Sequence, residues 1–134
     1  MKKKTVLVVE DSRVQAAFLE KLLEAQGVEV LKACNGRIGL DVAQQHLPDI
    51  IILDYDMPEL NGLETFQLLQ EDTQTADIPV IMMTAFADQV PLAVKGLDLG
   101  LIDFMHKDAF SDVVLLETLR QLHILEPKPV TKEL

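Results

Sequence analysis

Short runs of consecutive apolar residues alternate along the chain with longer stretches in which apolar residues recur every three or four positions. The runs are of strand length and cover residues 5–9, 28–32, 50–53, 79–83 and 101–105. The stretches between and after them have helical periodicity, over residues 14–25, 38–47, 63–69, 88–97 and 112–125. Uninterrupted apolar strands that alternate with helices are typical of a parallel sheet covered on both faces. We therefore predict an α/β fold with a doubly wound sheet of five parallel strands.

The first and last helices carry more specific signals. Ser12 and Gln15 have the spacing of a capping box, and the expected apolar face of the first helix is Val14, Phe18, Leu22 and Ala25. Ser111 or Asp112 is expected to cap the last helix, which is expected to reach Leu125. Its main apolar stripe is Leu115, Leu116, Leu119 and Leu122. Apolar residues outside this stripe predict either a partner surface or coverage by residues 126–134.

Polar side chains follow four of the five predicted strands. Glu10 and Asp11 follow the first strand and Asp54 the third, while Thr84 and Lys107 follow the fourth and fifth. Because ligands bind at the carboxyl ends of the strands in open α/β sheets, we expect these side chains to share one rim. A single acid at a strand end is ordinarily a solvated loop residue. The convergence of three acids with a hydroxyl and an ammonium group favours a functional site instead.

The side chains at this rim suit phosphoryl transfer. Three neighbouring carboxylates repel one another and raise one another's pKa unless a cation neutralises them, and Mg²⁺ prefers such oxygen ligands. Lys107 supplies a positive charge for a phosphoryl oxygen or for Asp54, and Thr84 supplies a hydroxyl donor beside the small Ala85. Phosphoryl transfer depends mostly on positioning and charge neutralisation. Asp54 is predicted to be the nucleophile that forms an aspartyl phosphate.

Composition narrows the class of protein. The chain has 134 residues, of which 49% are hydrophobic; this fits one domain over residues 1–126, with a tail or the start of a linker over 127–134. The net charge of −10 disfavours direct binding to nucleic acid. Without a signal peptide or membrane span, no membrane association and a cytoplasmic location are expected. Cys34 is expected to pack as a small apolar residue, and three separated histidines predict no zinc site.

The motifs at the strand ends resemble those of the receiver domains of two-component response regulators. The residues that carry the resemblance are Val8-Val9-Glu10-Asp11-Ser12, Leu53-Asp54-Tyr55-Asp56-Met57-Pro58 with Asn61-Gly62, Thr84-Ala85, and Asp103-Phe104-Met105-His106-Lys107. Each motif alone is weak, but all four occur in order, and the resemblance covers residues 4–125. It implies a flavodoxin-like (βα)5 fold with strand order 2-1-3-4-5.

The resemblance implies a role for each acid. Asp54 is expected to accept a phosphoryl group from a phosphohistidine of a partner histidine kinase or phosphotransfer protein. Asp11 and Asp54 are expected to ligate Mg²⁺ directly, together with the main-chain carbonyl of Asp56, while Glu10 acts through water. The chain is then expected to catalyse its own phosphorylation and slow dephosphorylation, without multiple turnovers of a metabolic substrate.

The resemblance also implies roles for residues that respond to the phosphate. Lys107 and Thr84 are expected to bind the phosphoryl oxygens, and Phe104 is expected to move inward with Thr84. The side chains of Asp56 and Phe86 are expected to control the access of water and hence the lifetime of the phosphate. The bulky Phe86 predicts slow hydrolysis, because it covers the site without offering a group to orient water.

One position departs from the family pattern. Proline usually follows the lysine, in a cis peptide, but here Asp108 follows Lys107. A cis bond before a non-proline residue costs ~3 kcal/mol, so a trans peptide and an enforced cis peptide are both open. Asp108 also adds a negative charge that is expected to weaken the field of the lysine.

Phosphorylation is expected to shift an existing equilibrium on one face of the domain, made by the predicted fourth helix, fifth strand and fifth helix. The predicted fourth helix has a thin apolar face, which makes it the candidate bistable element. A downstream protein target, and a homodimer through the last helix, are the candidate contacts of this face.

Two other classes of protein fit parts of the pattern. Haloacid-dehalogenase-like phosphatases also place Asp-x-Asp after an apolar strand, as Asp54 and Asp56 are placed here, but they need further acids after the lysine and usually a longer chain. A non-catalytic interaction module would keep the fold without phosphotransfer. Flavin binding is weaker still, because the rim is acidic and does not cradle phosphate.

Overall fold

A computed structural model describes residues 3–85 and 95–127 of the chain. The elements in chain order are β1 (Thr5–Val9), α1 (Arg13–Glu24), β2 (Glu29–Ala33), α2 (Gly36–His46), β3 (Ile50–Asp54), α3 (Gly62–Glu71), β4 (Val80–Thr84), β5 (Asp103–His106) and α5 (Ser111–Gln121). The five strands pair in parallel in the order β2-β1-β3-β4-β5. The predicted α/β fold and its strand order are therefore confirmed.

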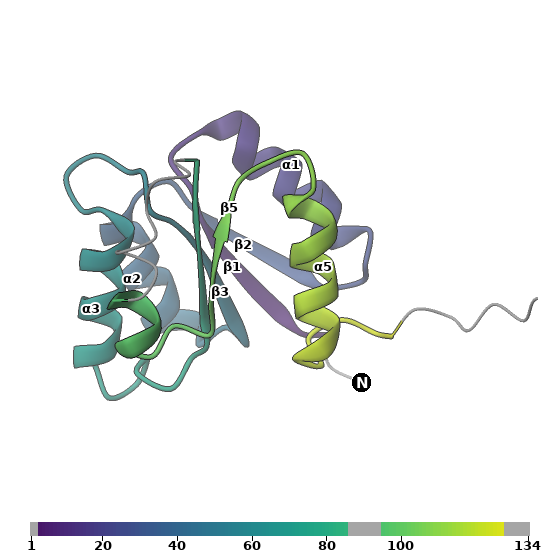
Figure 1. Ribbon diagram of the computed structural model, residues 1–134. Helices are drawn as coiled ribbons and strands as arrows, with labels where there is room; N and C mark the ends of the chain where they lie inside the picture. The colour runs from purple at the N-terminus through teal and green to yellow at the C-terminus, as the bar shows by residue number, and fades with distance from the viewer. Residues whose placement is uncertain (1–2, 86–94, 128–134) are drawn as a thin grey trace, which may run out of the picture.

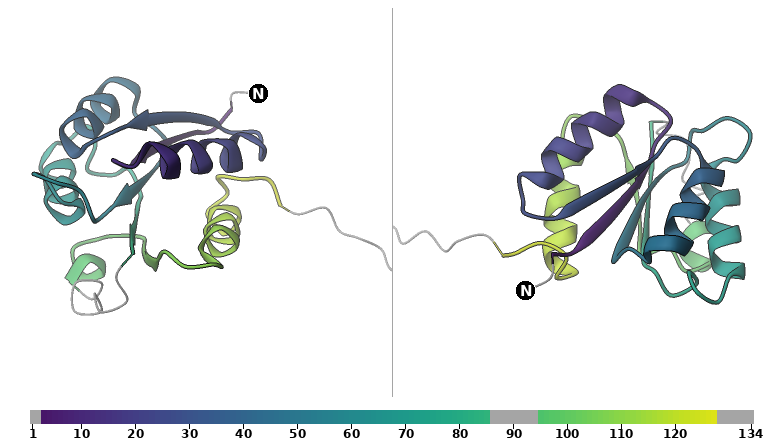
Figure 2. Two further views of the ribbon diagram at one scale, coloured as in Figure 1. Left: turned by 90° about the horizontal axis from the view of Figure 1, so that it is seen from above. Right: turned by 180° about the vertical axis from the view of Figure 1, so that it is seen from behind.

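Helices cover both faces of the sheet. Helices α1 and α5 lie on one side, while α2 and α3 lie on the other, together with the helical residues 95–98 (Figure 1). The views from above and from behind show the same three layers (Figure 2). This arrangement leaves the carboxyl ends of β1, β3, β4 and β5 at one edge of the molecule, as parallel pairing requires.

The strands divide their side chains between two cores. In β3, Ile51 and Leu53 pack with the core beneath α2 and α3, whereas Ile50 and Ile52 pack with the core beneath α1 and α5. Strands β1 and β4 divide in the same way because successive side chains of a strand point to opposite faces. Burial on both faces explains why these strands are uninterrupted apolar runs.

Strand boundaries differ from the prediction by one or two residues. The fifth run begins with Leu101, yet β5 begins only at Asp103. Gly100 has a φ of 110°, and the Leu101 N–H donates to the carbonyl oxygen of Gly96, so Leu101 still belongs to the turn before the strand. Leu101 is nevertheless buried. A buried apolar residue therefore does not mark the start of strand pairing here.

The predicted apolar face of α1 is wrong. Val14 is 80% exposed and Phe18 is 57% exposed, while Ala16 and Leu23 are buried and Leu19 packs against the core. Both sets have helical spacing, so periodicity alone does not choose between them. The Ser12 side chain caps the helix through the Gln15 N–H, and the helix then turns the second set toward the sheet.

The predicted ends of α5 are also wrong. The helix is preceded by Phe110, and neither Ser111 nor Asp112 caps it. Instead the Asp108 side chain accepts from the Phe110 N–H, and the Ser111 hydroxyl donates to the Asp108 carbonyl. The helix ends at Gln121, not Leu125, because His123 adopts a φ of 62°, which an α-helix does not allow.

The chain beyond α5 folds back onto the helix. The Leu125 N–H donates to the Leu119 carbonyl, and Leu125 is buried in the core beneath α1 and α5. Within α5, Leu115 and Leu119 of the predicted stripe are buried, while Leu116 and Leu122 are partly buried against the same core. The stripe is therefore confirmed, and the exposed Val113 and Val114 lie outside it.

Cys34 is exposed, so its predicted packing as a small apolar residue is wrong. It follows the last residue of β2, where the chain turns outward before α2. No helix within residues 3–85 and 95–127 is both long enough and apolar enough to cross a membrane. Phe86, most of the predicted fourth helix and residues 128–134 lie outside the described residues.

Candidate functional site

Asp54 is the last residue of β3 and is almost fully buried, with 4% of its surface exposed. Its Oδ1 accepts a hydrogen bond of 3.1 Å from the N–H of Asp56. The loop after the strand is closed at the Tyr55 carbonyl, which accepts from the N–H groups of Met57 and Gly62. A Cβ atom on Gly62 would lie 2.7 Å from the Asp54 carbonyl oxygen. The backbone of Asp54 is therefore pressed against the start of α3, and only glycine permits this approach.

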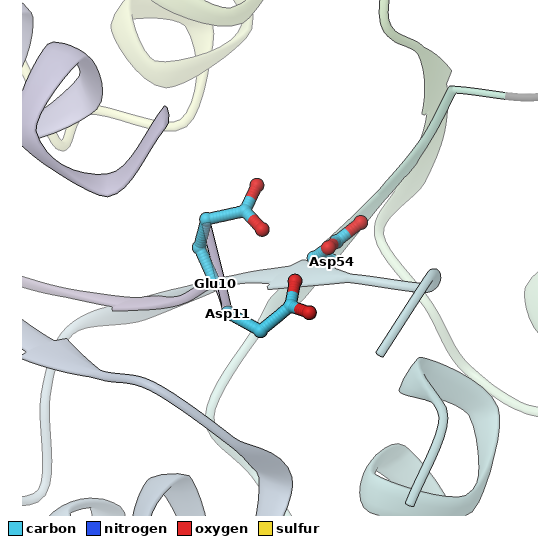
Figure 3. A group of neighbouring side chains, drawn as sticks. All are labelled: Glu10, Asp11 and Asp54. Carbon is cyan, nitrogen blue, oxygen red and sulfur yellow. The ribbon is translucent and has the colours of Figure 1, made fainter. Parts of the chain in front are cut away.

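Glu10 and Asp11 meet Asp54 at this edge of the sheet. One carboxylate oxygen from each residue lies within 4.8 Å of the other two, and the three side chains converge from the ends of β1 and β3 (Figure 3). Glu10 is 3% exposed, whereas Asp11 is exposed. Two buried carboxylates and one accessible carboxylate thus share a small volume.

Lys107 projects into this acidic cluster from the end of β5. Its Nζ donates to Glu10 Oε1 at 2.8 Å, to Asp54 Oδ1 at 3.0 Å and to Gln15 Oε1 at 2.8 Å. The backbone N–H of Lys107 donates to the Thr84 carbonyl, which fixes the residue beside β4. The ammonium group therefore uses all three of its protons on the rim.

The pKa values of Glu10 and Lys107 are both shifted within this cluster. Burial raises the pKa of Glu10 from its ordinary 4.5 to about 7, and the neighbouring Asp54 adds to this rise while Lys107 opposes it. Burial alone would lower the pKa of Lys107, but its hydrogen bonds and ion pairs with Glu10 and Asp54 outweigh burial and raise it. The predicted mutual effect of the acids on pKa is confirmed for Glu10. The cluster carries an excess of negative charge that one lysine balances only in part.

A divalent cation fits the chemistry of these donors. Glu10, Asp11 and Asp54 form a group of carboxylates that is able to hold a metal ion. Hard cations such as Mg²⁺ take oxygen ligands and commonly keep several waters, which the exposure of Asp11 allows. A bound cation would favour the ionised form of Glu10, whose pKa is raised by burial and further by the neighbouring Asp54.

The end of β4 is held by the side chain of Asp56. Thr84 is buried, and its Oγ1 hydroxyl donates to Asp56 Oδ2 at 3.0 Å. The Ala85 N–H donates to the same oxygen at 2.9 Å. On its other side, the Ala85 carbonyl accepts from His106 Nε2 at 3.2 Å. The loop that follows β4 therefore starts from a residue that is fixed at both its N–H and its carbonyl.

Phe104 lies further down β5 than the rim. It pairs with Met82 in the register of β4 and β5, two positions before the pair of Thr84 and His106. Its side chain is partly buried against the core beneath α2 and α3. Phe104 therefore lies on the same face of the sheet as Thr84. Phe86, the other aromatic residue predicted for the site, is outside the described residues.

The Lys107–Asp108 peptide is trans, since the described residues include no cis bond. Of the two conformations that the sequence left open, the unstrained one is therefore found. The Asp108 carboxylate accepts from the Phe110 N–H and lies 3.6 Å from His106 Nδ1. Among the described residues the hydrogen bonds of the Lys107 ammonium do not include Asp108, whose carboxylate instead serves the start of α5.

Four contacts at the rim were not predicted from the sequence. Gln15 was assigned to a capping box, but its side chain binds Lys107, and the Ser12 N–H donates to Glu10 instead. The Asp56 carboxylate was not expected to bind Thr84, and His106 was assigned no role. For Asp56 and His106, the position next to a strand end is the signal in the sequence that could have indicated a contact at the rim. Which partner each side chain takes depends on distances between strands.

Comparison with known proteins places the chain in a family. The model of the response regulator receiver domain matches residues 6–120. The chain belongs to this family, the receiver domains of two-component signalling, and not to the haloacid-dehalogenase-like phosphatases. Of the similar curated proteins, the polar-differentiation response regulator DivK of Brucella anthropi is 42% identical over 84 residues, which are 63% of this chain and 68% of DivK.

Solved structures agree with this assignment. The chemotaxis protein CheY4 of Vibrio cholerae matches with a TM-score of 0.81 and 29% identity, over 90% of this chain and 98% of CheY4. The receiver domain of a signal transduction histidine kinase from Syntrophus aciditrophicus matches with a TM-score of 0.79 and 32% identity, over 98% and 99% of the two chains. The family, the fold and the geometry of the rim thus point to one class of protein.

Proposed function

We propose that this protein is a phosphorylation-dependent switch that accepts a phosphoryl group on Asp54 from a phosphohistidine of a histidine kinase or phosphotransfer protein. The observation that supports this most directly is the position of Asp54, buried at a strand end, 3.0 Å from the Lys107 ammonium and beside two further acids. An aspartate with a purely structural role would not require a lysine and two further carboxylates beside it. The expected cytoplasmic location is part of this proposal and rests on the family alone.

In the proposed transfer, a carboxylate oxygen of Asp54 attacks phosphorus in line with the phosphorus–nitrogen bond of the donor. The new oxygen–phosphorus bond forms as that bond breaks, and the imidazole leaves with the electron pair and takes up a proton. Lys107 and Thr84 lie beside Asp54 at the ends of β5 and β4 and bind the phosphoryl oxygens. The chain supplies positioning and charge neutralisation, which dominate phosphoryl transfer.

Glu10, Asp11 and Asp54 would hold Mg²⁺ together with the main-chain carbonyl of Asp56, with Glu10 acting through water. When bound, the ion neutralises the charge that gathers on the phosphoryl oxygens.

Release of the phosphate by water is proposed to be slow, with Asp56 and Phe86 governing access. Replacement of Phe86 by alanine should therefore shorten the lifetime of the aspartyl phosphate, measured by its decay at fixed Mg²⁺; a longer lifetime would contradict this role.

The partner that supplies the phosphoryl group is proposed to approach beside α1. Val14 and Phe18 on α1, and Phe110 just before α5, are exposed apolar side chains. Val14 and Phe18 line an open cleft of about 430 Å³ that also reaches Glu10 and Lys107. Exposed apolar groups that border a charged site are common where proteins bind one another.

The downstream signal is proposed to pass to a protein target through the face that includes β5 and α5. Thr84 and Phe104 would move together, since they lie on one face of neighbouring strands. Exposed Val113 and Val114 on α5 also support a homodimer through this helix. Sedimentation velocity with and without phosphorylation would show dimers that Val113→Glu removes; an unchanged monomer would exclude this part. The division into a domain over 1–126 and a tail over 127–134 remains a proposal.

The proposed function is tested by incubating the protein with Mg²⁺ and acetyl phosphate and measuring intact mass. We expect wild type to gain the mass of one phosphoryl group and Asp54→Asn to gain none. Asp49→Asn is the matched control, because Asp49 lies just before the other end of β3 and should not prevent labelling. An unlabelled wild type would favour the non-catalytic interaction module, and several turnovers of acetyl phosphate without a stable label would favour a phosphatase.

A further inference from the structure

The carboxylate of Asp56 accepts hydrogen bonds from two donors at the end of β4, the strand that pairs with β3. Its Oδ2 accepts from the Thr84 hydroxyl at 3.0 Å and from the Ala85 N–H at 2.9 Å. We propose that Asp56 is a latch, which holds the end of β4 in the resting protein and competes with the phosphoryl group for these two donors. This inference rests on the proposed function, in which the phosphoryl group is attached to Asp54.

The latch joins the two strand ends that matter for the switch. The backbone N–H of Asp56 is bound to Asp54 Oδ1, and its side chain is bound to Thr84 and Ala85. The Ala85 carbonyl is held in turn by His106, which pairs with Thr84 in the sheet. A change at Asp54 therefore reaches the start of the loop after β4 through one residue.

Competition follows from the number of protons available. The Ala85 N–H and the Thr84 hydroxyl have one proton each, so neither forms a full hydrogen bond to Asp56 and to a phosphoryl oxygen at once. An aspartyl phosphate carries about −1.5 to −2 charges where an ionised aspartate carries −1, so phosphorylation of Asp54 adds up to about one negative charge two residues away from the Asp56 carboxylate, and like charges repel. Asp56 is only partly buried, so its side chain is able to leave toward water.

An acid serves this role better than an amide. A charged acceptor makes stronger hydrogen bonds than a neutral one, which stabilises the resting position of Thr84 and Ala85. The same charge is repelled by the phosphoryl group, which favours release of the latch. Asparagine keeps the acceptor oxygen without the charge, and alanine removes both. The two substitutions therefore separate the hydrogen bonds from the electrostatic effect of the carboxylate.

The first experiment uses the metal-free, unphosphorylated protein and measures hydrogen exchange of the Ala85 amide by NMR. We expect exchange to be about tenfold faster in Asp56→Ala than in wild type, the factor that loss of one net hydrogen bond produces, with Asp56→Asn in between. Asp49→Asn is the control, because it removes one negative charge just before the opposite end of β3, where Asp49 accepts from the Thr5 N–H. Equal exchange in wild type and Asp56→Ala would refute the latch.

The second experiment measures the affinity for beryllofluoride, a phosphoryl mimic, at saturating Mg²⁺ in the same four proteins. We expect Asp56→Ala to bind about tenfold more tightly than Asp56→Asn, because only alanine removes the competing acceptor oxygen. Equal affinity of the two variants would show that charge alone acts, and would overturn the competition. Acetyl phosphate labelling of wild type is a separate readout: if Asp54 is not labelled, the proposed function fails, while the exchange experiment still decides whether the latch exists.

Discussion

Glu10 shows how a single buried side chain at the rim affects the stability of the whole protein. Its raised pKa of about 7 means that the folded protein binds the Glu10 proton more tightly than the unfolded chain, where 4.5 is the ordinary value. Ionised Glu10 therefore opposes folding in the absence of a cation. The favourable contribution is complete below about pH 4.5 and is lost as the pH rises through about 7.

We predict that Glu10→Gln removes this dependence. In metal-free protein, the unfolding free energy of wild type should fall relative to that of Glu10→Gln by about 3 kcal/mol as the pH rises from about 4 to 8. Urea denaturation at a series of pH values in the presence of a chelator measures the difference. Asp49→Asn controls for the loss of one negative charge at the other end of the sheet. A difference that does not change with pH would contradict the burial argument.

At the scale of residues, the sequence identifies side chains by strand end but not by partner. Glu10, Asp11, Asp54, Thr84 and Lys107 come together as predicted, because parallel strands fix which ends meet. The contacts of Gln15 and the Asp56 carboxylate were missed. Each of these side chains has several polar groups in reach, and the choice among them depends on rotamers that only the folded structure determines.

The element that most directly constrains Asp54 is the start of α3. Asn61 and Glu64 form a complete capping box, in which each side chain accepts from the backbone N–H of the other. Gly62 then brings the first turn of the helix against the backbone of Asp54 and Tyr55. The cap stabilises the helix, whereas the glycine determines how closely the helix approaches the site.

These two contributions are separable by substitution. We predict that Asn61→Ala costs about 1 kcal/mol of unfolding free energy and leaves acetyl phosphate labelling of Asp54 unchanged. Gly62→Ala should cost about 1–3 kcal/mol, because its Cβ meets backbone atoms that have little room to move. It should also slow labelling, since the turn after β3 must shift. Denaturation curves and intact mass measure the two effects, and equally fast labelling of both variants would contradict the proposed role of the close approach.

At the scale of elements, the sequence predicts which elements exist better than where they end or how they are rotated. The apolar runs identify the three central strands, β1, β3 and β4, because these are buried on both faces, and shorter apolar patterns identify the edge strands β2 and β5, which are only partly buried. The prediction of the apolar face of α1 was wrong because two sets of apolar residues have helical spacing. The predicted end of α5 was wrong because Leu125 is buried by a turn that follows the helix. In the sequence, an apolar residue at this spacing cannot be distinguished from one further turn of helix.

For the whole molecule, charge and fold act together. The net charge of −10 is spread over a small domain, and the strand order brings three of its acids to one edge. The folded chain offers a divalent cation three carboxylates at one place, whereas an unfolded chain has no such arrangement. A ligand that binds only the folded state stabilises it by mass action.

We therefore predict that Mg²⁺ raises the melting temperature specifically. At a Mg²⁺ concentration about 100 times the dissociation constant, the stabilisation should be about 2.7 kcal/mol, which corresponds to a rise of roughly 10 °C for a domain of this size. Sodium chloride at matched ionic strength controls for general screening of the acidic surface, and Asp11→Asn should lose most of the rise. Because Mg²⁺ favours ionised Glu10, it should also weaken the pH dependence predicted for the metal-free protein. If sodium chloride raised the melting temperature equally, or if Mg²⁺ raised that of Asp11→Asn as much as that of wild type, the effect would arise from the net charge and not from the cluster.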